Sequence, residues 1–263
     1  MAYDRSCDEI VAQTGELASF LHRRDEPTDA RAPVASCPGW NVGQLLRHLG
    51  GVQRWAAQVV GSRAERPVPD EYHGPLTDYG DEDLQVVVPW LLDSAAQLAA
   101  TLRQAGPDVA VWTPVPNGTT GFYARRFAHE ALVHRADVSL ALDGTFTAEP
   151  EVAIDALDEW MELGSLPLHL DRDPRVRELL GPGRTLRLHA TDVRNGDTDW
   201  LVDLTGDVIA WRRSREPAAV TAEAPVTGLL LLVYGRITPT AAGATISGDE
   251  SLLDFWLERV GFG

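Results

Sequence analysis

The stretch RRFAHEALVHRADV, residues 125–138, holds the side chains best suited to chemistry. Glu130 and His134 are four residues apart, so on a helix a carboxylate oxygen and an imidazole nitrogen would project from one face. Both groups are common ligands of divalent metals. The pair alone is weak evidence, because the same spacing occurs by chance in many helices as a solvated face or an ion pair.

The helix that must position this pair carries its charges in the middle of an apolar arc. At 100° per residue, one stripe holds Tyr123, Arg126, Glu130, His134, Asp137 and Ala141. The stripe is flanked by Phe122, Val133 and Leu140 on one side and by Phe127 on the other. A solvated face is not normally bracketed in this way, so we expect the charged stripe to face the protein interior. The expected solvent face comprises Ala128, Arg135 and Ser139.

A second histidine is predicted to point inward from an earlier helix. In NVGQLLRHLGGVQRWAAQVV, residues 41–60, His48 lies at the centre of an apolar stripe. A single histidine on such a face is more often a hydrogen-bonded core residue. Together with Glu130 and His134, however, it could form a two-histidine, one-carboxylate site with open coordination positions, which is typical of catalytic metals. The residues alone leave both interpretations open.

The neighbouring residues allow weaker assignments. Asp137 could orient a ligand histidine or pair with Arg126, and an ordinary internal salt bridge is the alternative. His129 is expected on another flank and not as a ligand. Trp40 is expected to pack a loop against the helices. Cys37 could be a metal-adjacent or redox thiol, although a single loop cysteine is usually only a small residue.

The fold class predicted from the elements is α+β. Helical patterns over residues 7–23, 41–60, 81–106 and 119–142 favour a four-helix bundle. Further on, residues 184–192, 199–205 and 207–213 alternate like short strands, and helical patterns cover 151–164, 225–236 and 249–261. We therefore expect a helical, metal-binding domain over residues 1–147 and a small α+β domain over residues 148–263.

Composition excludes several classes of function. The formal net charge of −16 argues against nucleic acid or anionic membranes as partners. All 23 basic residues are arginine, which excludes a lysine Schiff base and a Walker-type phosphate loop. Two cysteines, no secretory signal and no membrane-spanning apolar run favour the cytoplasm.

Three segments, in order, resemble the mycothiol-dependent maleylpyruvate isomerase family of the DinB-like four-helix metalloenzyme superfamily. SCPGWNVGQLLRHLGGVQRWA resembles that family's PGW-x-V and L-x-x-H segment, and RRFAHEALVHRADV resembles its R-x-x-x-E-x-x-x-H-R-x-D helix. The C-terminal LRLHATD, GLLLLVYGR and ISGDESLLDFWL resemble its second domain. The resemblance implies a DinB-like four-helix bundle followed by a small, sterol-carrier-like α+β domain.

The resemblance also implies a divalent metal, usually zinc, held at the positions of His48, Glu130 and His134. It implies an active-site arginine at Arg236, which would bind a substrate carboxylate; a helix C-terminal cap is the alternative. The implied cosubstrate is mycothiol, whose thiol a metal would deprotonate for addition to a small-molecule electrophile. Departure of the thiolate gives cis–trans isomerisation, and its retention gives S-transfer.

Two other functions stay open from the sequence. One is a non-catalytic small-molecule-binding protein in which the metal is structural. The other is a metal-free bundle in which Glu130 and His134 form a buried ion pair. Substrate specificity is expected in the loops at 63–80 and 107–118 and in the cleft between the two predicted domains, since loops carry most binding determinants.

Overall fold

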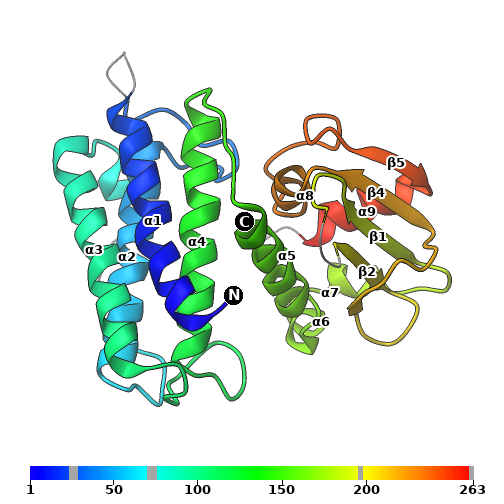
Figure 1. Cartoon of the computed structure of the whole chain (residues 1–263), viewed down its shortest axis with the longest axis horizontal. Coiled ribbons are helices and arrows are strands. Elements are labelled where there is room, and N and C mark those ends of the chain that lie inside the picture. Colours follow the sequence, from blue (N-terminus) through cyan, green and yellow to red (C-terminus); the bar gives the residue numbers. More distant parts are fainter. Residues whose placement is uncertain (24–28, 70–75, 195–197, 261–263) are drawn as a thin grey trace. The chain divides into compact units, whose positions relative to one another are not determined.

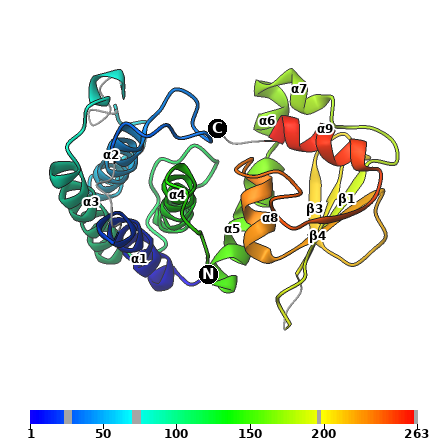
Figure 2. The same ribbon diagram turned by 90° about the horizontal axis from the view of Figure 1, so that it is seen from above.

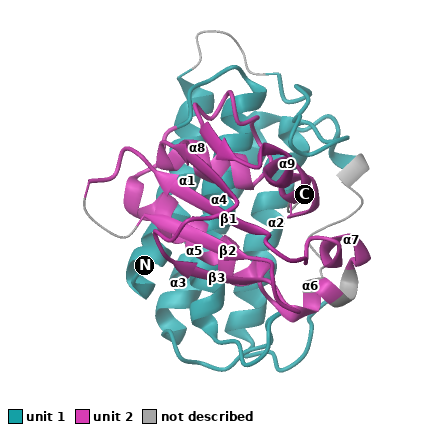
Figure 3. Cartoon of the chain, turned by 90° about the vertical axis from the view of Figure 1, so that its right-hand side faces the viewer, with its two compact units in different colours: residues 1–146 teal, residues 147–263 magenta. Residues whose placement is uncertain are grey.

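The computed structural model describes residues 1–23, 29–69, 76–194 and 198–260. The chain divides into two compact units, residues 1–146 (unit 1) and 147–263 (unit 2), which are coloured separately in Figure 3. Helices dominate unit 1 and a mixed sheet lies in unit 2, so the predicted α+β class is confirmed. No helix among the described residues is long and apolar enough to cross a membrane.

Unit 1 is the predicted bundle of four long helices (Figures 1 and 2). The helices are α1 (Tyr3–His22), α2 (Val42–Gly61), α3 (Leu84–Ala105) and α4 (Thr120–Ala141), with a short 3-10 helix η1 (Leu76–Tyr79) before α3. Helix α1 begins four residues earlier than the expected residue 7. Pro89, for which the sequence predicted a kink or a first turn, lies inside α3.

Short-range hydrogen bonds fix where the helices that carry the site begin. Asn41 and Gln44 form a capping box, in which each side chain accepts a hydrogen bond from the other residue's backbone N–H. The Thr119 side chain caps α4 by accepting from the Gly121 N–H. These caps stabilise the first turns of α2 and α4.

Helices α2 and α3 approach closely at Gly50. A Cβ atom at this position would lie 2.2 Å from the ring of Trp90. Only glycine fits there without moving the indole. Each of the two apolar clusters of the bundle contains residues from all four helices.

The face of α4 that was expected to meet solvent is buried, so that prediction was wrong. Ala128 and Ser139 are buried, and Arg135 is only 9% exposed. The reason is that α1 packs on this face. Arg135 Nε donates to Gln13 Oε1 over 2.8 Å, and its guanidinium lies over the Phe146 ring. The periodicity shows which residues share a face, but it does not show that both faces are covered.

Unit 2 is built on a five-stranded sheet with the order β3-β2-β1-β4-β5. The strands are β1 (Thr185–Ala190), β2 (Asp199–Asp203), β3 (Ala210–Arg213), β4 (Val220–Ala224) and β5 (Thr245–Gly248). The helices are α5 (Pro150–Gly164), α6 (Pro167–Arg172), α7 (Pro174–Arg177), α8 (Val226–Val233) and α9 (Glu250–Val260). Strand β1 pairs antiparallel with β2 and parallel with β4.

Two of these strands have no counterpart among the predicted elements. β4, with the sequence VTAEA, is rich in alanine, which has low strand propensity, yet it lies between β1 and β5. β5 has only four residues. Helix α8 contacts β1 and β4, and its leucines are buried.

Candidate metal centre

Helices α2 and α4 bring His48, Glu130 and His134 together inside unit 1. One ligand atom from each residue lies within 4.8 Å of the others. Glu130 Oε1 lies 3.0 Å from His134 Nε2 and 3.8 Å from His48 Nε2, and the two imidazole rings meet edge to face. Ligands of a tetrahedral zinc ion at about 2.1 Å are about 3.4 Å apart. The donor atoms are therefore close to the spacing that a metal requires.

The carboxylate of Glu130 is charge-compensated. Arg126 Nη2 donates to Glu130 Oε2 over 2.7 Å, which leaves Oε1 directed at the two histidines. Burial alone would raise the pKa of Glu130. The charge of Arg126 and the hydrogen bonds from His134 and His48 outweigh burial and hold the pKa well below its ordinary value. Glu130 is thus an anion at neutral pH.

The other nitrogen of His134 is held by Asp137. His134 Nδ1 lies 2.9 Å from Asp137 Oδ2, and the Asp137 side chain has no exposed surface. Because an ionised carboxylate only accepts, Nδ1 must carry the proton. When the ring is neutral, the lone pair is then on Nε2, which faces Glu130 and His48.

This contact also affects the charge of the imidazole. Burial lowers the pKa of His134, but the hydrogen bonds to Asp137 and Glu130 outweigh that effect and raise the pKa to about 9. Metal-free His134 is therefore an imidazolium at neutral pH. A metal that binds Nε2 must displace one proton.

Comparison with known proteins places unit 1 in a family. The sequence model described as "Mycothiol maleylpyruvate isomerase N-terminal domain" matches residues 10–139, nearly all of unit 1. Through unit 1, the chain belongs to the mycothiol maleylpyruvate isomerase N-terminal domain family. The match contains all three candidate ligands. No curated protein sequence matches the chain.

The fold extends the likeness beyond this family domain. A crystal structure of the mycothiol-dependent maleylpyruvate isomerase superposes with a TM-score of 0.62 at 12% identity, over 94% of this chain and 93% of that one. A structure of a histidine-to-alanine mutant of that isomerase gives the same TM-score and coverage at 11% identity. At these identities the likeness concerns the fold.

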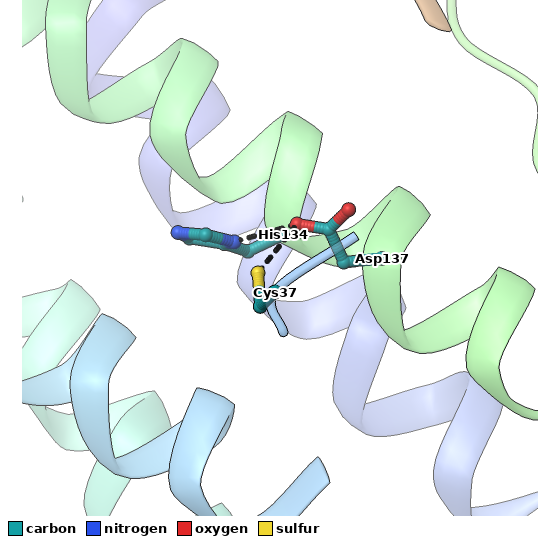
Figure 4. A group of neighbouring side chains, drawn as sticks. All are labelled: Cys37, His134 and Asp137. Carbon is teal, nitrogen blue, oxygen red and sulfur yellow. Dashed lines mark hydrogen bonds and ion pairs between the residues drawn. The ribbon is translucent and has the colours of Figure 1, made fainter. Parts of the chain in front are cut away.

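In this family member, the loop before α2 makes more contacts with the candidate metal centre than the sequence predicted. Ser36 Oγ donates to Asp137 Oδ1 over 2.7 Å. Cys37 Sγ lies 4.0 Å from Asp137 Oδ2, as Figure 4 shows. The Trp40 ring, expected only to pack the loop, lies 4.9 Å from the His48 ring. The Pro-Gly-Trp sequence at residues 38–40 predicted a loop at this place. Its contacts with α4 could not be predicted because about a hundred residues separate the partners.

Other candidate residues of this family member lie elsewhere. His129 is fully buried and belongs to neither ligand group found among the described residues. Arg236 follows α8 in unit 2, where its Nη1 donates to the Tyr234 carbonyl oxygen over 2.6 Å. Its assignment to the substrate carboxylate stays a prediction.

The two loops expected to set specificity are joined by a hydrogen bond. In the loop at 107–118, the Trp112 N–H donates to the Ala64 carbonyl over 2.6 Å. The loop at 63–80 returns along α2, because Trp55 Nε1 donates to the Val68 carbonyl and Asn41 Nδ2 donates to the Gly80 carbonyl. Residues 70–75 of this loop lie outside the described residues. The role of both loops in specificity stays a prediction.

Proposed function

We propose that this protein is a metal-dependent enzyme that uses mycothiol as its thiol cosubstrate and isomerises a small electrophilic molecule. The observation that carries the proposal is the convergence of His48, Glu130 and His134 within 4.8 Å, from two helices of a bundle that belongs to the isomerase family. Two imidazoles and one carboxylate leave coordination positions for a thiol, as catalytic sites do.

The chain's own residues fit a divalent ion, with zinc as our assignment. Two neutral Nε2 atoms and one carboxylate oxygen are borderline donors that suit zinc. When bound, such an ion lowers the pKa of a coordinated thiol and so supplies a thiolate at neutral pH. Asp137 keeps the His134 Nδ1 proton in place, and Arg126 holds the second oxygen of Glu130. Trp40 limits the rotation of the His48 ring.

The proposed reaction needs one further group for the substrate. Addition of a thiolate to an electron-poor double bond, rotation about the resulting single bond and loss of the thiolate give cis–trans isomerisation. We assign Arg236 to the substrate carboxylate, because a guanidinium binds a carboxylate through two parallel hydrogen bonds. We place the reaction in the cytoplasm, where thiols are kept reduced.

The test is incubation of zinc-loaded protein with mycothiol and a panel of electrophiles that includes maleylpyruvate, followed by mass spectrometry. An isomer without adduct supports the isomerase. A stable thioether product would show that the enzyme is an S-transferase and not an isomerase, since S-transfer uses the same thiolate. If neither product forms although an electrophile of the panel binds, the result would favour the non-catalytic small-molecule-binding protein.

Metal content separates these outcomes from a metal-free bundle. We expect about one zinc per chain by elemental analysis, and its loss in His48→Ala. The matched control is His22→Ala, which removes an exposed histidine at the end of α1. Wild-type protein without stoichiometric metal, or a His48→Ala variant that keeps metal and activity, would overturn the proposal.

A further inference from the structure

A second set of potential metal ligands shares His134 with the candidate centre. Cys37, His134 and Asp137 each offer one ligand atom, and these three atoms lie within 4.8 Å of one another. Cys37 comes from the loop before α2, whereas the other two come from α4 (Figure 4). The set therefore joins two parts of unit 1 that are distant in sequence.

One carboxylate oxygen is the centre of this set. Asp137 Oδ2 lies 2.9 Å from His134 Nδ1 and 4.0 Å from Cys37 Sγ. The other oxygen of Asp137 accepts from Ser36 Oγ, which keeps Oδ2 directed at the thiol and the imidazole. Donor atoms around a tetrahedral ion are about 3.4–3.7 Å apart. Side-chain movements of less than about 1 Å would therefore bring the three donor atoms to the spacing that a bound cation requires.

The backbone already holds Cys37 in position. The Cys37 N–H donates to the Val34 carbonyl over 3.0 Å, and the Cys37 carbonyl accepts from the Trp40 N–H over 2.9 Å. Cys37 is partly exposed, so an ion can reach it, whereas Asp137 is buried. A thiolate and a carboxylate together neutralise a divalent ion, which lowers the cost of burying it.

We propose that Cys37, His134 and Asp137 form a second coordination set for a thiophilic divalent ion such as Cd²⁺, and that its occupation excludes a metal from the His48, Glu130 and His134 set. The thiolate is the soft ligand that such ions prefer. The proposal uses the same His134 as the proposed function, but it does not require that function to be correct.

Exclusion follows from the two ring nitrogens of His134. The first set needs His134 Nε2 without a proton, and the proton stays on Nδ1, which donates to Asp137 Oδ2. The second set needs His134 Nδ1 without a proton. The proton is then on Nε2, which lies 3.0 Å from Glu130 Oε1 and donates a hydrogen bond to it. A neutral imidazole carries one proton, so each tautomer serves one set.

The proton balance is complete for the second set. When His134 is neutral, binding of a divalent ion releases the Cys37 thiol proton to solvent, and the ring proton moves from Nδ1 to Nε2 by exchange with solvent. New bonds form from the ion to Sγ, Nδ1 and Asp137 Oδ2. No oxidant or reductant takes part.

Ultraviolet absorption tests the proposal directly, because thiolate-to-cadmium charge transfer reports only a cysteine ligand. We expect Cd²⁺ added to metal-free protein to produce this band and to saturate at one ion per chain. The band should be lost in Cys37→Ala, because any cadmium bound by the remaining set has no thiolate ligand. It should persist in His48→Ala, which disables only the first set.

The controls use the other cysteine and the count of ions. Cys7 is fully buried and burial raises its pKa to about 11, so Cys7→Ala should keep the band. Native mass spectrometry with Zn²⁺ and Cd²⁺ together should give one ion per chain. Absence of the band in wild type, its survival in Cys37→Ala, or two ions per chain would each overturn the proposal. An inactive protein that shows the band would refute the proposed function alone.

Discussion

Replacement of Asp137 by asparagine should weaken the metal centre without changing its shape. Asparagine is nearly isosteric and can still accept from His134 Nδ1, while its amide group faces the hydroxyl of Ser36. What it lacks is the negative charge that holds the imidazole. Because this charge acts on a ligand and not on the ion itself, we expect metal affinity to fall about 10- to 100-fold.

The same change should alter the stability of the metal-free protein in a pH-dependent way. The rise in the pKa of His134 from 6.5 to about 9 corresponds to at most about 3 kcal/mol of folding free energy. A raised pKa stabilises the fold fully below pH 6.5, and this contribution is lost as the pH rises through about 9. The hydrogen bond to Asp137 is the largest single effect that raises this pKa, so Asp137→Asn should remove a substantial part of the contribution.

Urea unfolding of both proteins at pH 6 and pH 10, in the presence of a chelator, measures this effect. The loss of stability between the two pH values should be smaller in Asp137→Asn than in wild type. Ser36→Ala is the matched control, since it removes the hydrogen bond from Ser36 to Asp137 and leaves the charge. Equal metal affinity together with an equal pH dependence in wild type and Asp137→Asn would refute this reasoning.

Three further results are expected. A chelator should lower the melting temperature of zinc-loaded wild type but not of His48→Ala, because a metal that bridges α2 and α4 binds only the folded state; calorimetry measures this. Gly50→Ala should destabilise the bundle by about 1–3 kcal/mol in urea, because its Cβ would meet the Trp90 ring at 2.2 Å. Arg236→Lys should raise KM for a carboxylate substrate with little change in zinc content, and unchanged kinetics would contradict the assignment of Arg236 to the substrate.

The architecture of unit 1 could be predicted because its helices are long and their apolar spacing is regular. The inward direction of the charged stripe on α4 followed from the large apolar residues that flank it. The error at Arg135 has the same origin. A helix projection assigns each face to the interior or to solvent from the residue types on it. It therefore assigned the charged Arg135 to solvent, although Arg135 contacts Gln13 and Phe146.

The contacts around the candidate ligands were harder to predict, because they join distant segments. The sequence left a ligand histidine and Arg126 as alternative partners of Asp137. The fold shows that Asp137 contacts His134 and Ser36. Trp40 and Cys37 carry no spacing relation to α4 that a single sequence could reveal. Strand β4 was missed because pairing with β1 and β5, and not local propensity, makes it a strand.

The hydrogen bond between Ser36 and Asp137 spans 101 residues, and this has a consequence for the order of assembly during synthesis. At about 5–20 residues per second, a ribosome needs about 5–20 s to make the chain between the two partners. During that time α1, α2 and α3 can pack together, while His48 has neither Glu130 nor His134 beside it. A metal ion bound by the proposed ligands would therefore not guide the early steps of folding. It would stabilise a bundle that α4 has already completed.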